Sequence, residues 1–227
     1  MPLLGSAAML LSFDVATEAI DEHDRWHTHE HLPERLAIPG FLRGTRWVAA
    51  EGTPRYMVLY EVRDLPVLSS DAYLARLNAP SPWTQRMMPH YRGMSRGLCT
   101  VRGSFGEGLG GTSALVRFEA GPDDAQRVQR WLLEEALPSQ PLTAGLGSAH
   151  LLQGAQAAAM TNEQRIRGAD RGVDSAIVLT GYDGNAVSEG ARRLCAGLQH
   201  VAPGVRDVGC TTYAMHYMLA STDLGTC

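Results

Sequence analysis

An internal repeat constrains the fold of this chain more than any other feature of its sequence. The segment Arg-Trp-His-Thr-His-Glu-His-Leu-Pro at residues 25–33 aligns with Arg-Trp-Leu-Leu-Glu-Glu-Ala-Leu-Pro at residues 130–138, an offset of 105 residues. The same offset carries Gly40 onto Gly145. Strand-like runs precede both segments, at residues 8–13 and 113–118. Since self-similarity at a fixed spacing marks repeated structural units, the two halves are predicted to begin with the same strand, helix and turn.

The rest of each half continues in a common order. Two further strands, rich in β-branched and aromatic residues, are followed by a helical region and a last strand. In the first half these elements are expected at residues 41–50, 56–62, 70–94 with breaks at Pro80 and Pro82, and 97–104. In the second half they are expected at residues 146–153, 175–181, 186–200 and 209–219. The glycine-rich residues 106–111 are predicted to link the halves.

The order strand, helix, strand, strand, helix, strand is that of a ferredoxin-like unit. Both helices of such a unit cover one face of its sheet, so the other apolar face is most simply buried by a second sheet. The predicted fold class is α+β, with two tandem ferredoxin-like (β-α-β-β-α-β) units, residues 1–107 and 108–227, forming one pseudo-symmetric α+β barrel. The first unit is expected to hold the candidate site, and the second to be its structural counterpart.

The halves differ between their second and third strands, where the second half carries an insertion at residues 155–173. The insertion contains Thr161-Asn162-Glu163-Gln164, a pattern typical of the capping box that begins a helix. Two interpretations stay open at this point. One is a short extra helix or lid, and the other is a mobile surface loop.

Three histidines of the first repeat lie four residues apart and would form one stripe on a helix: His23, His27 and His31. The offset of 105 carries this stripe onto three apolar residues: Val128, Leu132 and Ala136. In the second half the apolar stripe is expected to be the buried face of the helix. By pseudo-symmetry the histidines are predicted to point inward, between helix and sheet.

Buried imidazoles need hydrogen-bond partners or water, and a polar cavity in the first half is the simplest reason for burying them. His27 and His31 are the candidate catalytic residues, acting as general bases near neutral pH. His23, Trp26 and Glu30 are candidate substrate-binding residues. Alternatives stay open: acidic neighbours suit a solvated or structural stripe, and the spacing suits zinc, iron or haem. Without an HExxH motif, no metal ligand and no cofactor is assigned.

Further substrate-binding candidates come from later elements of the first half. Arg43 and Arg46 lie on opposite faces of the second strand, so one of them is expected to reach the cavity, and Arg46 is the candidate for holding an oxyanion. Tyr60 shares a strand face with Tyr56, and Trp83 lies in the second helical region. Motifs of serine hydrolases, P-loop NTPases and Rossmann enzymes are missing from the sequence.

Composition and charge narrow the partners. The net charge is −4 and the basic residues are dispersed, which argues against nucleic acid. No apolar run approaches the roughly 18 residues that span a bilayer, and the apolar start lacks the basic residues of a signal peptide. The four cysteines form no CxxC pair, which fits a reducing cytoplasm. The expected partners are a small-molecule ligand and, through exposed sheet edges, a second copy in a homodimer.

The motifs of the first half carry a resemblance. They resemble the dimeric α+β barrel (ferredoxin-like) superfamily, and most of all its EthD-like and related uncharacterised proteins. The likeness covers residues 8–106 well and the second half in outline. Because members usually pair two ferredoxin-like subunits, it implies that this chain is a fused tandem of two units. The matching motifs are Trp26, Glu30-His31-Leu32-Pro33, Pro39-Gly40-Phe41, Arg46, Tyr60-Glu61 and Pro82-Trp83-Thr84.

The resemblance also implies a pocket between sheet and helices. The superfamily uses such pockets for cofactor-free oxygenation of aromatic compounds, isomerisation, lactone chemistry, haem breakdown or binding alone. The sequence therefore predicts a small-molecule-binding protein, with a cofactor-free oxygenase or isomerase acting on an aromatic or polyketide-like metabolite as the catalytic interpretation. A non-catalytic ligand-binding or assembly protein, or a His-ligated metal or haem protein, is the alternative. Because Ala136 stands where the first half has His31, an activity of that histidine should occur once per chain.

Overall fold

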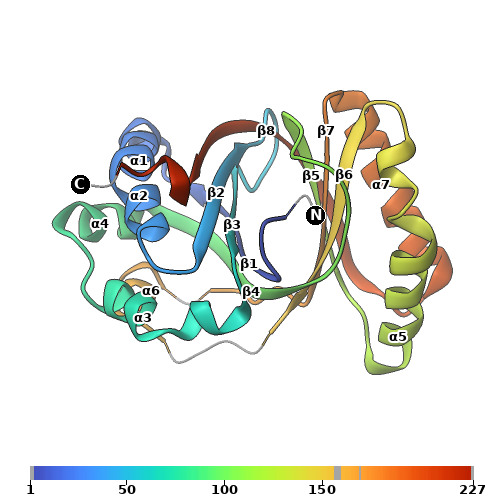
Figure 1. Cartoon of the computed structure of the whole chain (residues 1–227), viewed down its shortest axis with the longest axis horizontal. Coiled ribbons are helices and arrows are strands. Elements are labelled where there is room, and N and C mark those ends of the chain that lie inside the picture. Colours follow the sequence, from blue (N-terminus) through green and yellow to red (C-terminus); the bar gives the residue numbers. More distant parts are fainter. Residues whose placement is uncertain (1–2, 156–159, 169, 226–227) are drawn as a thin grey trace.

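The eight strands of the structure close into one antiparallel barrel. The computed structural model describes residues 3–155, 160–168 and 170–225. Around the barrel the strands follow the order β1-β3-β2-β8-β5-β7-β6-β4, so each half contributes a four-stranded sheet of ferredoxin-like order (Figure 1). The strands are β1 Ala7–Val15, β2 Phe41–Val48, β3 Tyr56–Val62, β4 Tyr91–Gly106, β5 Thr112–Glu119, β6 Leu146–Gly154, β7 Ser175–Gly181 and β8 Arg206–Ala220.

The helices lie outside the barrel in two groups. Figure 1 shows α5 and α7 along one side of the sheet, and α1 to α4 together with α6 on the opposite side. The α-helices are α1 Ile20–Trp26, α2 Leu32–Leu36, α3 Asp71–Asn78, α4 Pro82–Met87, α5 Pro122–Trp131, α6 Asn162–Arg167 and α7 Gly184–Val201. Single π turns follow α1 and α5, at His27–His31 and Leu132–Ala136. Short 3-10 turns cover Thr17–Ala19, Leu65–Ser69, Met88–His90, Gln140–Leu142 and Ser221–Asp223.

The alternation of side chains along each strand builds two kinds of core. In β1, Met9 and Leu11 face the helices, whereas Ala8 and Leu10 face the barrel interior. The interior is filled by residues of both halves, such as Leu59 from β3 together with residues of β5 and β7. The predicted α+β class and the burial of the free sheet face by a second sheet are therefore confirmed. The division into units at residues 107 and 108 stays a prediction.

The offset of 105 residues also relates the backbones of the halves. It carries the π turn His27–His31 onto the π turn Leu132–Ala136, and both lie at the same distance from their strands. Gly40 and Gly145 both have positive φ angles, of 95° and 89°, a conformation that glycine adopts without a Cβ penalty. Pro33 lies at the start of α2 and does not end the helical segment. The π turn accommodates the proline and α2 continues to Leu36.

Most element boundaries agree with the sequence, and the clearest difference is the helical region at residues 70–94. The helices end at Met87, and after a 3-10 turn β4 begins at Tyr91, six residues before the predicted strand at residue 97. Pro89 has no backbone N–H and cannot continue the helix. β1 also extends to Val15, which pairs with Tyr91, so the longer partner strand extends β4.

The insertion forms the short helix α6, as one of the two interpretations predicted. Residues 156–159 and 169 of the insertion lie outside the described residues. On either side of α6 the chain is held to β4, because the Ala155 N–H donates to the Leu98 carbonyl at 2.7 Å and the Arg171 N–H to the Met94 carbonyl at 2.9 Å. Since β6 pairs with β4 in the closed barrel, an insertion from the second half lies over the first half.

Two further expectations, a homodimer through sheet edges and the lack of a membrane-spanning segment, can be compared with the structure. Each of the eight described strands is paired on both sides, so the barrel leaves no free sheet edge for a dimer, and a homodimer through another surface stays a prediction. Among the residues that the structure describes, no helix is both long and apolar enough to cross a membrane.

Candidate functional site

The histidine stripe is buried between helix and sheet. His23, His27 and His31 are 0%, 2% and 8% exposed, while His29, off the stripe, is exposed. The stripe therefore points inward as predicted, and the alternative of a solvated stripe is wrong. The aliphatic counterpart in the second half is buried as well, since Leu132 is fully buried.

The buried rings form a continuous aromatic row. The ring centroids of His23 and His27 are 5.5 Å apart, and those of His27 and His31 are also 5.5 Å apart. The Trp26 ring lies 4.4 Å from His31. Because each ring is held by its neighbours, the imidazoles have fixed positions relative to the sheet below them.

Tyrosines on the sheet face two of the imidazoles. The Tyr91 hydroxyl of β4 lies 3.3 Å from His23 Nε2, and the Tyr60 hydroxyl of β3 lies 3.4 Å from His27 Nε2. His23 Nδ1 lies 3.2 Å from the Asp24 carboxylate. Which nitrogen carries the proton depends on the tautomer. His23 is thus satisfied on both sides, and His27 on one side only.

Two imidazole nitrogens are left without partners. Nδ1 of His27 and Nδ1 of His31 are buried and make no hydrogen bond within the described part of the chain. Burial lowers the pKa of both histidines well below the ordinary value, and nearby cations add to the effect, Arg46 and Arg35 at His27 and Arg35 and Arg167 at His31. Both rings are therefore neutral at pH 7, so one ring nitrogen of each can accept a proton.

His27 and His31 border an interior cavity between the helices and the sheet. Its volume of about 30 Å³ holds roughly two ordered waters, since a single water needs roughly 10–15 Å³ on this measure. An organic ligand would have to displace this water and move part of the wall. The apolar wall includes Met9, Leu11, Phe13, Val58, Met88 and Met94. The polar wall includes His27, His31, Arg35, Tyr60, Tyr73, Tyr91, Arg96, Glu163 and Arg167.

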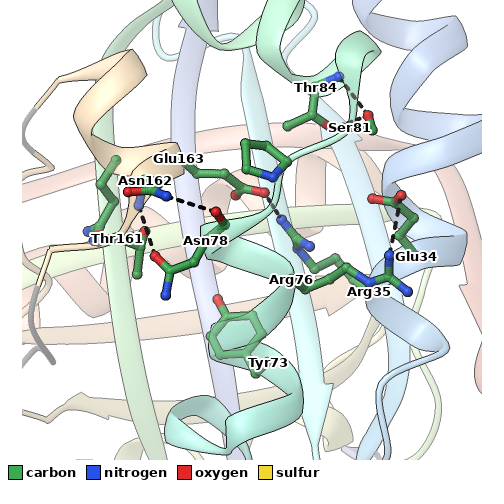
Figure 2. Close-up of polar contacts among 12 residues, drawn as sticks. Glu34, Arg35, Tyr73, Arg76, Asn78, Ser81, Thr84, Thr161, Asn162 and Glu163 are labelled. Atoms are coloured by element: carbon green, nitrogen blue, oxygen red, sulfur yellow. Dashed lines mark hydrogen bonds and ion pairs between the residues drawn. The ribbon is translucent and has the colours of Figure 1, made fainter.

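Helix α6 forms one wall of this cavity, with Glu163, Gln164 and Arg167 among the lining residues. Its Glu163 forms a buried ion pair with Arg35 of α2, and its Asn162 bonds to Asn78 at the end of α3. Figure 2 shows Arg35 and Glu163 pointing toward each other from opposite sides, with Tyr73 of α3 below them. The insertion of the second half therefore supplies one wall of a site in the first half.

The Arg35–Glu163 pair was not predicted from the sequence. Burial alone would lower the pKa of Arg35, but the adjacent Glu163 carboxylate raises it, so the guanidinium stays charged. Nη2 binds Glu163, whereas the buried Nη1 has no partner. The one available signal was the repeat, in which the uncharged Gln140 stands at the position of Arg35.

Arg46, the predicted oxyanion donor, lies outside the cavity wall. It donates to the Asp24 carbonyl at 3.2 Å and to the Thr28 hydroxyl at 3.0 Å, and its Nε lies 3.2 Å from His216 Nδ1 of β8. Arg43 lies on the opposite strand face, as predicted, and binds Glu61. Arg46 therefore joins α1 to the sheet and acts on the histidines only through its charge.

Trp26, Glu30 and Trp83 hold helices together rather than line the cavity. Trp26 Nε1 donates to Glu30 Oε1 at 3.1 Å, and Glu30 also accepts from Ser81 at the start of α4. Trp83 Nε1 donates to Glu22 Oε1 at 2.8 Å. Trp26, Glu30 and Trp83 thus fix α4 against α1 and the π turn that follows it.

Within the described residues, no group of three or more His, Cys, Asp and Glu side chains is arranged to hold a metal ion. The three stripe histidines lie in a row along the helix, with ring centroids 5.5 Å apart between neighbours. Side chains in such a row do not converge on one point, as the ligands of a tetrahedral site do.

The whole chain has the fold of ferredoxin-like α+β barrel proteins. A crystal structure of an anthrone oxidase-like protein aligns over 100% of this chain and 99% of its own, with a TM-score of 0.65 and 9% identity. A proposed monooxygenase from Lactobacillus acidophilus aligns over 95% and 96%, with a TM-score of 0.59 and 9% identity. Another from Fusobacterium nucleatum covers 96% of each chain, with a TM-score of 0.61 and 7% identity.

Sequence comparison adds nothing to this likeness. No protein-family model matches the chain, and no curated protein matches it. At identities this low the structural likeness shows the fold alone. The function has to be argued from the site.

Proposed function

We propose that this protein is a small-molecule-binding enzyme that removes a proton from an aromatic or polyketide-like ligand in the first-half cavity, without a cofactor. The observation that carries the proposal is the pair of nitrogens, Nδ1 of His27 and Nδ1 of His31, that have no hydrogen-bond partner among the described residues and whose side chains line the cavity. Buried polar atoms of native proteins are nearly always paired, so a ligand group that pairs with these nitrogens accounts for them.

The electrostatics of the cavity favour one kind of proton transfer. A neutral imidazole accepts a proton from an acidic C–H or O–H group of the ligand, and the ligand keeps the electron pair as an enolate or phenolate. An imidazolium alone is unfavourable here, because burial lowers the pKa of both histidines. A negative ligand oxygen formed beside it offsets that cost. The site therefore suits ligands whose proton loss places negative charge on oxygen.

The structural neighbours suggest a first probe. One is named as anthrone oxidase-like and others as proposed monooxygenases. Anthrones carry a methylene group that is acidic because its carbanion is conjugated, through the aromatic rings, with the ketone across the central ring. In an oxygenase reaction the carbanion would react with dioxygen as a second substrate, whereas an isomerase consumes none. An oxygen electrode separates these two reaction types.

Deuterium uptake tests the proton transfer itself. An anthrone is incubated with the protein in D2O, and incorporation at the methylene group is followed by NMR. We expect His31→Gln and His27→Gln to slow the exchange by about 100-fold, a typical contribution of a general base. His29→Gln changes an exposed histidine of the same helical segment and should leave the exchange unchanged. Binding without exchange would instead support a ligand-binding protein.

The finer relationship to known families is a separate proposal. We infer that the two halves descend from a fused pair of EthD-like units. Support comes from the offset of 105 residues, which relates the two π turns as well as the sequence motifs. Because the buried stripe is apolar in the second half, the proposed activity occurs once per chain.

A further inference from the structure

Charges around the cavity do not balance. Arg35, Arg96 and Arg167 reach it from α2, β4 and the end of α6. Glu163 neutralises Arg35, and Asp170 neutralises Arg167. Arg96 donates to the Tyr73 hydroxyl at 3.1 Å, and no carboxylate among the described residues pairs with it. The wall therefore carries one positive charge in excess.

Arg35 has a donor that no described residue accepts from. Its side chain is 2% exposed and its Nη2 binds Glu163, while the buried Nη1 has no acceptor. Figure 2 shows the Arg35 side chain pointing from α2 toward Glu163 of α6, and Arg35 lines the cavity. A charged donor without an acceptor in a buried site is unfavourable, so an oxygen atom supplied by a ligand fits this position.

A basic cleft adjoins the cavity on its outer side. The cleft has a volume of about 460 Å³, and it shares Tyr91, Met94 and Arg167 with the cavity wall. It is also lined by Arg117 and Arg171, neither of which pairs with a carboxylate in the described chain. The one acidic residue in its wall, Asp14, accepts the backbone N–H of Arg55. Such a cleft raises the local concentration of anions.

We propose that the ligand of the first-half cavity is a small aromatic anion whose negative oxygen, a phenolate or a carboxylate, accepts the N–H of Arg35 Nη1. This inference rests on the proposed function and names the substrate class of that site. The ligand enters from the arginine-lined cleft past Tyr91 and Met94. Its aromatic part replaces water against the methionine and aliphatic wall, and its anionic end lies at Arg35. Arg35 is then a binding residue for the proposed reaction.

A chromogenic phenol tests the inference. 4-Nitrophenol absorbs differently as phenol and as phenolate, so its spectrum reports its charge when it is bound. The measurement is made below the solution pKa of the probe, with 4-nitroanisole as an uncharged analogue of similar shape. We expect the wild-type protein to bind the probe as phenolate and to bind the anisole more weakly.

Three variants separate the role of Arg35 from general effects on the fold. Replacing both Arg35 and Glu163 by Met removes the pair while keeping similar volumes, and should weaken phenolate binding about ten- to hundredfold. Glu163→Gln leaves the Arg35 cation without its counter-charge, so the probe should bind more tightly and raise the melting temperature more than in the wild type. Arg76→Met changes an exposed residue paired with Glu34 and should bind the probe like the wild type.

The outcomes distinguish this inference from the proposed function. Equal binding of phenol and anisole in the wild type and in all three variants would overturn the anionic ligand and leave the proposed proton transfer standing. Phenolate binding that persists in the double Met variant would overturn the role of Arg35. If the protein binds neither compound and exchanges no anthrone proton, both proposals fail.

Discussion

The first helical segments of the two halves have nearly the same backbone, but the side chains on their buried faces differ in polarity. Residues 20–36 and 122–136 both form an α-helix followed by a π turn at the same place in the repeat. In the first segment the inward stripe is histidine, and in the second it is aliphatic and borders a pocket of about 60 Å³ between α5 and the sheet. The difference shows that the backbone tolerates either interior. The buried imidazoles are therefore a property of the first-half side chains and not of the backbone of this segment.

The second helical segments differ in the backbone itself. In the second half α7 is a continuous helix of 18 residues, whose Val187, Ala191 and Leu194 are buried against the sheet. Residues 65–90 of the first half contain four prolines and form two short helices flanked by 3-10 turns. Because proline interrupts a helix, this segment cannot cover the sheet as α7 does. The uncovered space is the cavity, and α6 closes it.

The largest expected effect concerns the ion pair between Arg35 and Glu163. The residue that corresponds to Arg35 in the second half is the uncharged Gln140. Arg35→Met leaves Glu163 buried without a partner, and the free energy of unfolding should fall by roughly 3–5 kcal/mol. Urea unfolding with linear extrapolation measures the change.

Removing both charges is the control for this prediction. With Arg35 and Glu163 both replaced by Met, most of the lost stability should return, because apolar residues of similar volume replace a buried ion pair at little cost. If Arg35→Met alone is as stable as the wild type, Glu163 reaches water when Arg35 is absent, and α6 is not held tightly over the cavity.

Exchanging residues between the stripes tests the comparison directly. Leu132→His buries an imidazole in the mainly aliphatic interior of the second half, and should lower the free energy of unfolding by about 2–4 kcal/mol. The reverse change, His27→Leu, removes an unpartnered buried nitrogen and should be neutral or stabilising by up to roughly 1 kcal/mol. If His27→Leu destabilises as strongly as Leu132→His, His27 is needed for folding and the case for a functional cavity weakens.

Lowering the pH should reduce the free energy of unfolding of the wild type more than that of a variant in which aliphatic residues replace the histidine stripe. The folded-state pKa values of His27 and His31 lie well below the ordinary value of 6.5, so below that pH the unfolded chain takes up protons that the folded chain does not. The free energy of unfolding should therefore fall with decreasing pH, by about 1 kcal/mol for each histidine between pH 6.5 and about pH 5.5.

A double variant measures how much of this pH dependence of the free energy of unfolding comes from His27 and His31. His27→Leu with His31→Ala should lose about 2 kcal/mol less than the wild type over the same interval. His150, whose pKa is lowered to about 3 by burial in the barrel, is present in both proteins and cancels. Parallel pH profiles would mean that the imidazoles titrate normally and are not closed off from water.

The fold could be predicted from the sequence because the repeat ties weak local signals together. A single strand-like run such as residues 56–62 is ambiguous, but its recurrence at residues 175–181 in the same order is not. The direction of the histidine stripe was predictable for the same reason. Its counterpart contains Leu132, and the apolar face of a helix is the face that is buried.

The cavity wall was predictable only in part. Arg35 and Glu163 are 128 residues apart in the chain, and their meeting depends on the pairing of β6 with β4 when the barrel closes. No local pattern carries that information. One of Arg43 and Arg46 was expected at the cavity because strand alternation places them on opposite faces. Alternation does not reveal that Asp24 of α1 and Thr28 of the following π turn bind Arg46.

The smallest expected effect concerns the start of α6, the helix by which one half closes the site of the other. The Gln164 side chain accepts from the backbone N–H of Thr161 at 2.9 Å and donates to Asp170 at 2.9 Å. Gln164→Ala should cost about 1 kcal/mol, the usual effect of losing a helix cap, and this cost falls on local opening of α6 rather than on global unfolding. Amide hydrogen exchange should therefore quicken within residues 162–167 and stay unchanged in α7. Gln126→Ala, an exposed change on α5, is the matched control. Faster exchange throughout the barrel would instead show that α6 opens only when the whole protein unfolds.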